Sequence, residues 1–248
     1  MAVPMSAPAK ILFLGLKDCS YSERAYELLR LAGMDTQRLL SGARGEALPD
    51  RVRSWQGDYI LCFRSYFILP KALIDRAHIA AINFHPAPPD YPGSGCVNLA
   101  LYDGAKTYGV TAHVMNEKVD NGPIIHCRRF PIFPQDTVST LLARTLHESF
   151  GLFCDVVNGL FESGADYLRL MMERATGERW AGSAHKISEI DRLQRIGMGC
   201  SREQLERIIR ATYTDKFRPF IELHDYRFVL EHPFPACVRQ DRSEGAVS

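Results

Sequence analysis

Three short apolar runs, separated by stretches with helical spacing, constrain the fold of this 248-residue chain more than any other feature of its sequence. The runs lie at residues 10–15, 58–63 and 79–84, and their length is typical of buried strands. Helical spacing follows the first run at residues 22–32, and a second helical stretch at 71–76 separates the other two runs. Strands that alternate with helices in this way predict a parallel sheet with crossover connections.

The pattern changes after the third run. Residues 86–95 are dense in proline and glycine and predict a rigid loop, which a short helix at 97–102 follows. Residues 109–115 alternate like a strand, and residues 122–131 follow a tight turn as its expected partner. A long amphipathic helix is predicted over 137–162, where apolar residues share one face and should close the core.

Beyond Gly177 the composition becomes that of a polar connector. A helix at 201–210 opens with capping-box spacing, and a terminal hairpin is predicted over 220–230. We therefore predict an α/β fold with a Rossmann-like core, a mixed but mostly parallel sheet and a small C-terminal subdomain ending in a hairpin. The expected boundaries are 1–177 for the main domain, 178–232 for the subdomain and 233–248 for a disordered tail.

The bulk composition excludes several classes of protein. Hydrophobic residues make up 46% of the chain, which is enough for a real core, and 30 basic against 29 acidic residues leave no strong field for nucleic acid or membrane. Seven cysteines without a CxxC pair indicate a reduced, cytoplasmic protein, and no leader or membrane-spanning segment is expected. The turn at Gly15 lacks GxGxxG, so dinucleotide binding is not expected, and no clustered metal-ligand set appears.

The densest chemical signal lies at the end of the third apolar run. Asn83 and His85 are two residues apart in an extended strand, so their side chains point into the same cavity. An amide N–H can stabilise an oxygen that becomes negative, a histidine can take or return a proton, and a nearby Asp120 would favour the charged ring. By itself such a pair is also typical of structural hydrogen bonding, so spacing alone does not identify a reaction.

The stretch INFHPAPPDYPGSGCVNLALYDGAKTYGVTAHVMNEKVDNGPII at residues 82–125 resembles the core of the folate-dependent formyltransferases. NxHP, a Pro/Gly loop, a helix, GVTxH and DxGPI recur there in order. The resemblance implies a formyltransferase core in which Asn83, His85 and Asp120 occupy the catalytic positions. Because residues 109–115 should form a core strand, His113 is more readily interpreted as a satisfied core histidine than as a catalytic one, and both interpretations stay open.

The resemblance also implies that 10-formyltetrahydrofolate is the formyl donor and that no metal takes part. In the family the pterin lies in a slot made largely of backbone from two loops. The matching residues are Tyr66, Phe67, Ile68 and Leu69 in the first loop and Glu117, Lys118 and Val119 in the second. Core packing is an equally good interpretation of residues 67–69.

The acceptor is narrowed by comparison within the family. Methionyl-tRNA formyltransferase has a further domain of roughly 100 residues, whereas about 70 residues follow Gly177 here, and the loop at residues 93–98 lacks the cation of the purine enzyme. The nucleotide-sugar N-formyltransferases are the most similar, which implies a small-molecule acceptor such as a dTDP- or GDP-linked 4-amino-4,6-dideoxyhexose, used for O-antigen and lipopolysaccharide. The resemblance places Ser94, Cys96 and Asn98 beside the sugar and Trp180, His185 and Lys186 as candidate contacts of the nucleotide or diphosphate. A packing anchor is an equally good interpretation of Trp180, and a solvated side chain on the connector is the alternative for Lys186.

Several alternatives stay open. Hydroxyornithine, glycinamide ribonucleotide and methionyl-tRNA are other possible acceptors, and a non-catalytic folate-binding module is a hypothesis of another class. A nucleophilic thiol at Cys96 is the weaker idea, because its only evident base partner is His85. The resemblance further implies a homodimer, with the hairpin region 220–230 as the expected contact.

Overall fold

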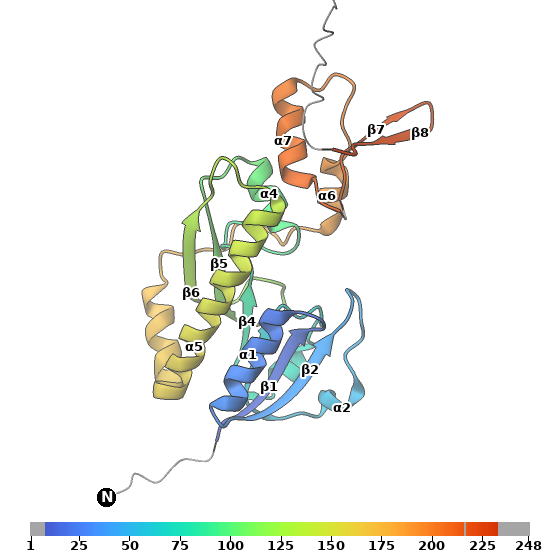
Figure 1. Cartoon of the computed structure of the whole chain (residues 1–248). Coiled ribbons are helices and arrows are strands. Elements are labelled where there is room, and N and C mark those ends of the chain that lie inside the picture. The colour runs from blue at the N-terminus through green and yellow to red at the C-terminus, as the bar shows by residue number, and fades with distance from the viewer. Residues whose placement is uncertain (1–7, 216, 233–248) are drawn as a thin grey trace, which may run out of the picture.

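One mixed sheet of six strands forms the centre of the molecule in the computed structural model, which describes residues 8–215 and 217–232. The strand order is β2-β1-β3-β4-β5-β6 (Figure 1). The first four strands pair in parallel, and β5 and β6 each run antiparallel to their neighbour. This arrangement confirms the predicted Rossmann-like, mostly parallel sheet. The bounds are β1 Lys10–Leu16, β2 Asp35–Ser41, β3 Gly57–Phe63, β4 Ala77–His85, β5 Thr107–Val114 and β6 Ile124–Pro131.

Helices cover both faces of this sheet because its central strands are apolar on both sides. In β1, Ile11 and Phe13 face the core under the helices α1 (Ser20–Leu31) and α5 (Val138–Arg174), whereas Leu12 and Leu14 face the short helices α2 (Asp50–Arg53) and α3 (Lys71–Ile74). Continuous apolar runs of this kind are what a doubly covered parallel sheet requires. The two faces therefore have separate cores.

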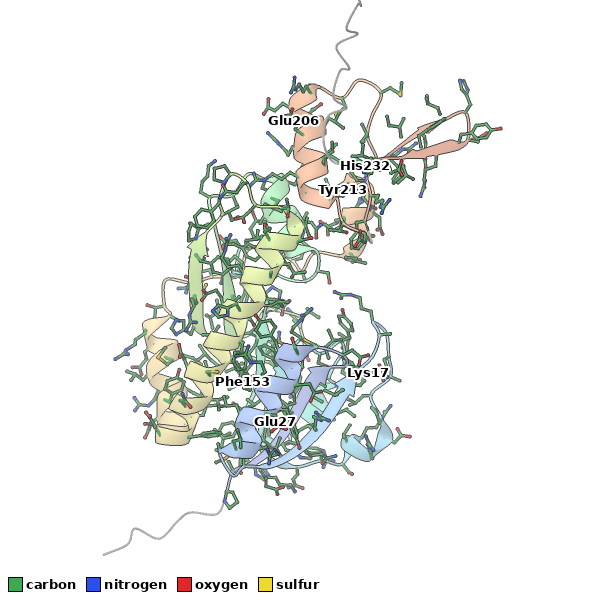
Figure 2. All side chains as sticks on the ribbon, viewed as in Figure 1. Lys17, Glu27, Phe153, Glu206, Tyr213 and His232 are labelled. Atoms are coloured by element: carbon green, nitrogen blue, oxygen red, sulfur yellow. The ribbon has the colours of Figure 1, made fainter. Side chains whose placement is uncertain are left out.

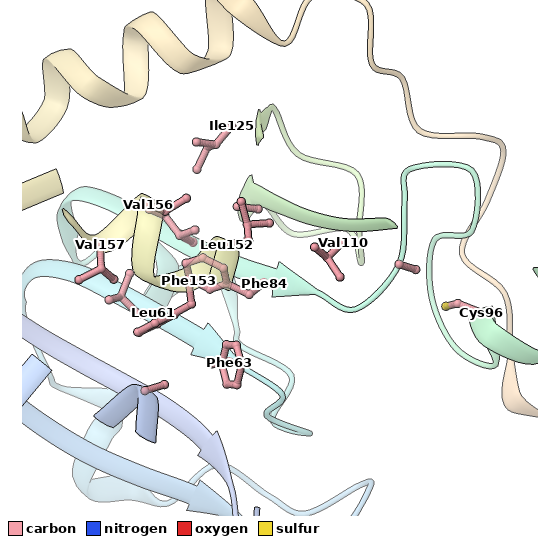
Figure 3. Packing of buried hydrophobic residues seen from close by; sticks show 14 of the residues in the cluster. Leu61, Phe63, Phe84, Cys96, Val110, Ile125, Leu152, Phe153, Val156 and Val157 are labelled. Atoms are coloured by element: carbon pink, nitrogen blue, oxygen red, sulfur yellow. The ribbon is translucent and has the colours of Figure 1, made fainter. Parts of the chain in front are cut away.

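The larger core is organised around one aromatic side chain of α5. Phe153 is fully buried, and its ring lies 5.3 Å from that of Phe63 and 4.9 Å from that of Phe84 between ring centroids. Figure 3 shows Phe153 with Leu152, Val156 and Val157 of α5 beside the strands, within the larger core. This packing fixes β4, the strand that ends at the site, against α5.

The element α5 consists of two helical segments, and the first matches the helix predicted over 137–162. It begins after a capping box in which Thr137 accepts a hydrogen bond from the backbone of Thr140, and a second segment, which was not predicted, continues to Arg174. Its path is broken at Gly164, where φ is 54° and ψ is −128°. The ring of Tyr167 then packs against Gly159, where a Cβ would lie 2.2 Å from the ring. Only glycines at these two places allow the helix to fold back on itself.

The C-terminal part contains α6 (Ile187–Leu193), α7 (Arg202–Thr212) and the hairpin of β7 (Phe220–Leu223) and β8 (Tyr226–Val229). The hairpin and α7 were predicted, whereas α6 was not, because residues 178–200 read as a polar connector. Figure 2 places Glu206, Tyr213 and His232 on this part and Phe153 in the main body. The boundary at residue 177 stays a prediction, and the predicted tail from residue 233 lies outside the described residues.

Two further features complete the fold. The helix α4 (Cys96–Tyr102) follows the Pro/Gly loop and lies beside α7, to which Asn98 is hydrogen-bonded through the carbonyl of Ala211 at 2.7 Å. Within the described ranges, no helix combines the length and the apolar character that crossing a bilayer would need.

Candidate active site

The site is built where the parallel and antiparallel halves of the sheet meet. Asn83 and His85 lie at the carboxyl end of β4 and share one face of it, as their spacing predicts. The register of β4 with β5 places Asn83 directly opposite His113 and His85 opposite Thr111. Paired residues of antiparallel strands point to the same face, so these four polar side chains lie on one face of the sheet.

Asp120 closes this group from the loop between β5 and β6. Its backbone is left-handed, with φ 44°, and its side chain is only 7% exposed. One carboxylate oxygen, Oδ1, accepts a hydrogen bond from Asn83 Nδ2 at 3.2 Å, and Oδ2 accepts one from the backbone N–H of Gly93 at 2.8 Å. The carboxylate is thereby fixed between the end of β4 and the Pro/Gly loop.

His85 faces an acceptor with each ring nitrogen. Its Nδ1 lies 3.2 Å from Asp120 Oδ2, and its Nε2 lies 2.9 Å from the backbone oxygen of Tyr91. A histidine can satisfy two acceptors at once only when both nitrogens carry protons. The contacts of this buried ring therefore favour the imidazolium.

The charges of this pair shift both pKa values. Burial opposes the charged form of His85, but the Asp120 carboxylate, followed by contacts with Cys96 and Tyr91, outweighs it and raises the pKa of His85 from 6.5 to about 9. Burial likewise opposes ionisation of Asp120, yet the charge of His85 and a hydrogen bond from His113 lower the pKa of Asp120 from 3.8 to about 2. Both side chains are therefore charged near neutral pH.

His113 is buried and has polar partners, which agrees with its prediction as a satisfied core histidine, and two of those partners belong to the same group. The ring is buried, and its Nε2 lies 3.1 Å from Asn83 Nδ2 and 3.3 Å from Asp120 Oδ1. The other nitrogen, Nδ1, faces the backbone oxygen of Val114 at 3.1 Å. The alternation of the GVTxH strand indicates in the sequence that His113 lies on a strand. Its position opposite Asn83, however, follows only from the register of β4 with β5.

Trp180 covers this group from the connector after α5. Its indole N–H donates to the backbone oxygen of Gly122 at 2.7 Å, and its ring lies edge-on to His113 at 4.9 Å and to His85 at 5.9 Å between ring centroids. The sequence placed Trp180 beside the nucleotide, and that contact stays a prediction. What the structure shows is a side chain against the two histidines.

A cavity of about 460 Å³ lies next to Asp120. Its walls are the loop residues 118–121 and the connector residues 182–184, so the connector and the Asp120 loop face each other across it. A space of this size can admit a small-molecule substrate. The described residues hold no group of three or more His, Cys, Asp or Glu side chains placed to bind a metal ion.

Of the two segments predicted to hold the folate, only the second contributes to a second cavity, of about 390 Å³. Glu117 and Lys118 line it together with Met115, Asn116 and residues of α3. Of the first predicted segment, Phe67 and Leu69 are buried in the smaller core, which supports core packing for those two, whereas Ile68 is 75% exposed and Tyr66 half-buried. Val119 is 53% exposed, so it and Ile68 present apolar surface on the two segments.

The predicted acceptor residues of the Pro/Gly loop have different surroundings. Cys96 is buried, donates its S–H to the backbone oxygen of Gly93 and lies 3.9 Å from His85 Nε2. Ser94 accepts a hydrogen bond from Arg44 at 3.3 Å, a residue that the sequence did not single out. The amide of Asn98 is engaged with α7, so its contact with substrate stays a prediction.

His185 and Lys186 lie on the connector directly before α6. The backbone of His185 bridges to the Pro/Gly loop, donating to Pro92 O and accepting from Ser94 N, each at 2.9 Å. Its ring faces Glu189 at 2.8 Å, and Lys186 is exposed at the start of α6. Their predicted nucleotide contacts remain untested by this geometry.

Gly93 is the residue that allows this close approach. Its φ is +93°, and a Cβ there would lie 2.5 Å from both the N and the O of His185. A side chain at this position would therefore push the connector off the loop whose N–H binds Asp120.

Comparison with known proteins agrees with this geometry. The family model described as formyl transferase matches residues 21–157, and phosphoribosylglycinamide formyltransferase of Haemophilus influenzae is 30% identical over 118 residues, which are 47% of this chain and 56% of that protein. The chain spans about half the length of the first curated relatives it matches, or less.

Solved structures share the fold over a longer span. A sugar N-formyltransferase from Shewanella sp FDAARGOS_354 has a TM-score of 0.65 at 17% identity and covers 90% of this chain and 96% of its own. An N-formyltransferase from Helicobacter canadensis, in complex with folinic acid and dTDP-3-aminofucose, has a TM-score of 0.62 at 13% identity and covers 88% and 85%. The matched family model contains β4, β5 and the loop of Asp120, and it confirms the resemblance seen in residues 82–125. This chain belongs to the formyl transferase family.

Proposed function

We propose that this chain transfers the formyl group of 10-formyltetrahydrofolate to the amine of a nucleotide-linked amino-deoxy sugar. The observation that carries the proposal is the buried group of Asn83, His85 and Asp120 beside the cavity bounded by the connector. Family membership supports formyl transfer. A fold shared with sugar N-formyltransferases over nearly their whole length supports a sugar acceptor.

The chemistry follows from the charges of the site. The acceptor amine attacks the formyl carbon as the neutral base, a C–N bond forms and the carbonyl oxygen becomes negative. Asn83 and the imidazolium of His85 carry N–H groups that can stabilise that oxygen once they exchange a present contact, with Asp120, His113 or Tyr91, for it. One well-placed donor contributes roughly 3 to 4 kcal/mol. Because His85 is already protonated, we assign it to donation rather than to taking the first proton.

Proton balance gives Asp120 its role. The attacking amine must lose one proton and the nitrogen that leaves the formyl carbon must gain one, so no net proton is consumed. Asp120 is ionised and hydrogen-bonded in place, and it can orient a water that accepts the amine proton. His85 supplies the proton for the leaving nitrogen and regains one through the Asp120 pair.

The residues around the smaller cavity fit the folate donor. Glu117 and Lys118 offer charged and main-chain hydrogen-bonding groups, and Ile68 and Val119 expose apolar side chains on the two predicted segments. A flat ring with polar edges needs such a combination of main-chain partners and apolar faces. We propose that Tyr66, Ile68 and residues 117–119 hold the donor.

The acceptor would enter between the Asp120 loop and the connector, where the larger cavity lies. Ser94 and Cys96 lie on the Pro/Gly loop, and His185 and Lys186 follow the connector residues that line the larger cavity. The exposed ammonium of Lys186 can make charge-assisted hydrogen bonds to a diphosphate. A 4-amino-4,6-dideoxyhexose on dTDP or GDP, used for a surface glycan, is the acceptor we propose.

The direct test is an acceptor panel. The protein is incubated with 10-formyltetrahydrofolate and dTDP- or GDP-linked 4-amino-4,6-dideoxyhexoses, and the products are weighed by mass spectrometry. A formylated sugar supports the proposal, whereas product only with hydroxyornithine, glycinamide ribonucleotide or methionyl-tRNA would move the acceptor to another class. No product with any acceptor, together with folate binding, would favour a binding module.

A matched pair of variants distinguishes a loss of the site's chemistry from a general effect of replacing a histidine by asparagine. His85→Asn should abolish turnover because it removes the imidazolium, whereas His147→Asn changes an exposed histidine of α5 and should leave turnover at the parental rate. Unchanged turnover in His85→Asn would remove the proposed mechanism.

We also propose a homodimer that forms through the C-terminal hairpin, in a cytoplasmic protein. Tyr226, Phe228 and Val229 are 73%, 58% and 50% exposed on β8, and Figure 1 shows the hairpin projecting from the body. Exposed apolar side chains on one hairpin suit a self-complementary contact. The six cysteines among the described residues are all free, which suits a reducing compartment.

A further inference from the structure

The connector at residues 180–185 is held to the catalytic loops at several separate points. Ala181 donates its N–H to Pro89 O at 2.9 Å, and the His185 backbone bridges the loop around Gly93. Just before it, Arg129 of β6 joins Glu178 at 2.8 Å. The connector therefore packs along the site rather than away from it.

From this segment we infer that Trp180 is a positioning residue of the catalytic centre, one that holds the Asp120 loop and closes the side of the two histidines. The inference rests on the proposed function, because it assigns Trp180 to the formyl-transfer step. It differs from a role as a nucleotide contact, because the indole N–H is already used within the protein.

The hydrogen bond to Gly122 acts on Asp120 through the backbone. Gly122 is two residues after Asp120 and lies so close to β5 that a Cβ would be 1.8 Å from the oxygen of Val114. Asp120 itself has a left-handed backbone, which a non-glycine residue adopts only when its surroundings hold it. Trp180 supplies one such restraint from outside the loop.

The ring of Trp180 acts on the histidines directly. Its edge-on contacts, at 4.9 Å to His113 and 5.9 Å to His85, cover one side of the two rings, which are only 2% and 4% exposed. Keeping water away strengthens the attraction between His85 and Asp120, which lie 3.2 Å apart. The N–H and the ring thus have separable effects on one catalytic pair.

Two variants separate these effects in steady-state kinetics. Trp180→Phe keeps an aromatic ring but loses the N–H donor, and kcat should fall about fivefold, the loss of one hydrogen bond. Trp180→Ala loses both the aromatic ring and the N–H donor, and its kcat should fall further, by about tenfold or more. In each case the KM of the acceptor should stay within about twofold of the parent, because the interaction is with the catalytic pair.

Trp55→Phe is the matched control. Trp55 is buried in the smaller core, away from the site, and its indole N–H has no hydrogen-bond partner among the described residues. Its kcat should be unchanged. The inference is overturned if Trp180→Phe raises the acceptor KM at constant kcat, which indicates substrate contact, or if its kcat matches that of Trp55→Phe.

A second measurement needs no turnover. The chain has two tryptophans, so in Trp55→Phe the single indole N–H signal in NMR belongs to Trp180. That signal should exchange slowly with solvent, and it should shift when His85→Asn is added but not when His147→Asn is added. Fast exchange of the Trp180 signal, or the same signal position with His85→Asn as with His147→Asn, refutes the inference. This test does not depend on turnover, so it can be read even if no acceptor is formylated and the proposed function has failed.

Discussion

Replacing Asp120 by Asn tests the electrostatic basis of the site most directly. Asparagine has nearly the same shape and can still accept the hydrogen bond from Gly93, but it lacks the negative charge 3.2 Å from His85 Nδ1. Without the Asp120 charge, burial is the largest of the effects that remain on the pKa of His85, and it disfavours the charged ring. The contacts with Cys96 and Tyr91 are smaller effects that still favour the charged ring. The pKa of His85 should therefore fall from about 9 to below its ordinary value of 6.5.

The change in protonation is large at the pH of an assay. At about pH 7.5 the parent ring is almost fully protonated, whereas a ring with a pKa below 6.5 is protonated in less than about one molecule in ten. The variant thus loses both the carboxylate and the imidazolium donor. Turnover should drop by a factor of about 10² to 10⁴, the range for loss of acid–base catalysis.

The assay is an NMR titration of the histidine ring protons in both proteins. His85 is identified among the eight histidines by the signal that disappears in His85→Asn. The parent signal should titrate near pH 9, and the Asp120→Asn signal below 6.5. A parent midpoint near 6.5, or a variant midpoint still near 9, would show that the carboxylate does not control the ring.

Three further outcomes test the packing around the site. Gly93→Ala should destabilise the fold to urea by roughly 1–3 kcal/mol, because its Cβ would meet the His185 backbone; Gly104→Ala has a similar positive φ with open space and should lose less. Asn98→Ala removes the donor to a carbonyl of α7 and should cost about 1–3 kcal/mol in urea unfolding at constant acceptor KM, whereas a raised KM would support substrate contact. Phe228→Glu should convert a dimer into monomers in sedimentation velocity; a persistent dimer would place the interface elsewhere.

The strand that carries Asn83 and His85 could be predicted because its signal is local. An apolar run shows the strand, and the period of two shows that both side chains share a face, as the structure has them. Asp120 could be placed only by resemblance, because its approach to His85 depends on a loop with a left-handed backbone. Nothing in its local spacing indicates that geometry.

Other elements escaped prediction for identifiable reasons. The strand β2 lies at the sheet edge and is polar along much of its length, so it shows no apolar run. The helix α6 has seven residues and only Ile190 buried, which gives too little periodicity to recognise. In α5 the segment after Gly164 was not predicted, because its attachment to the first segment depends on the backbone conformation of that glycine.

The register between β4 and β5 is what completes the site. Because β5 runs opposite to β4, its last residues lie beside the residues that carry the chemistry, and His113 falls opposite Asn83. The backbone of Met115 then bonds to Ala81 at 2.7 Å, so the chain turns back at once and needs only a short loop to bring Asp120 over the strand. A slip of one residue would move His113 to the other face and lengthen that loop. Strand pairing therefore completes the site. The local motif predicted that Asn83 and His85 share a face, but it could not predict that His113 lies opposite Asn83.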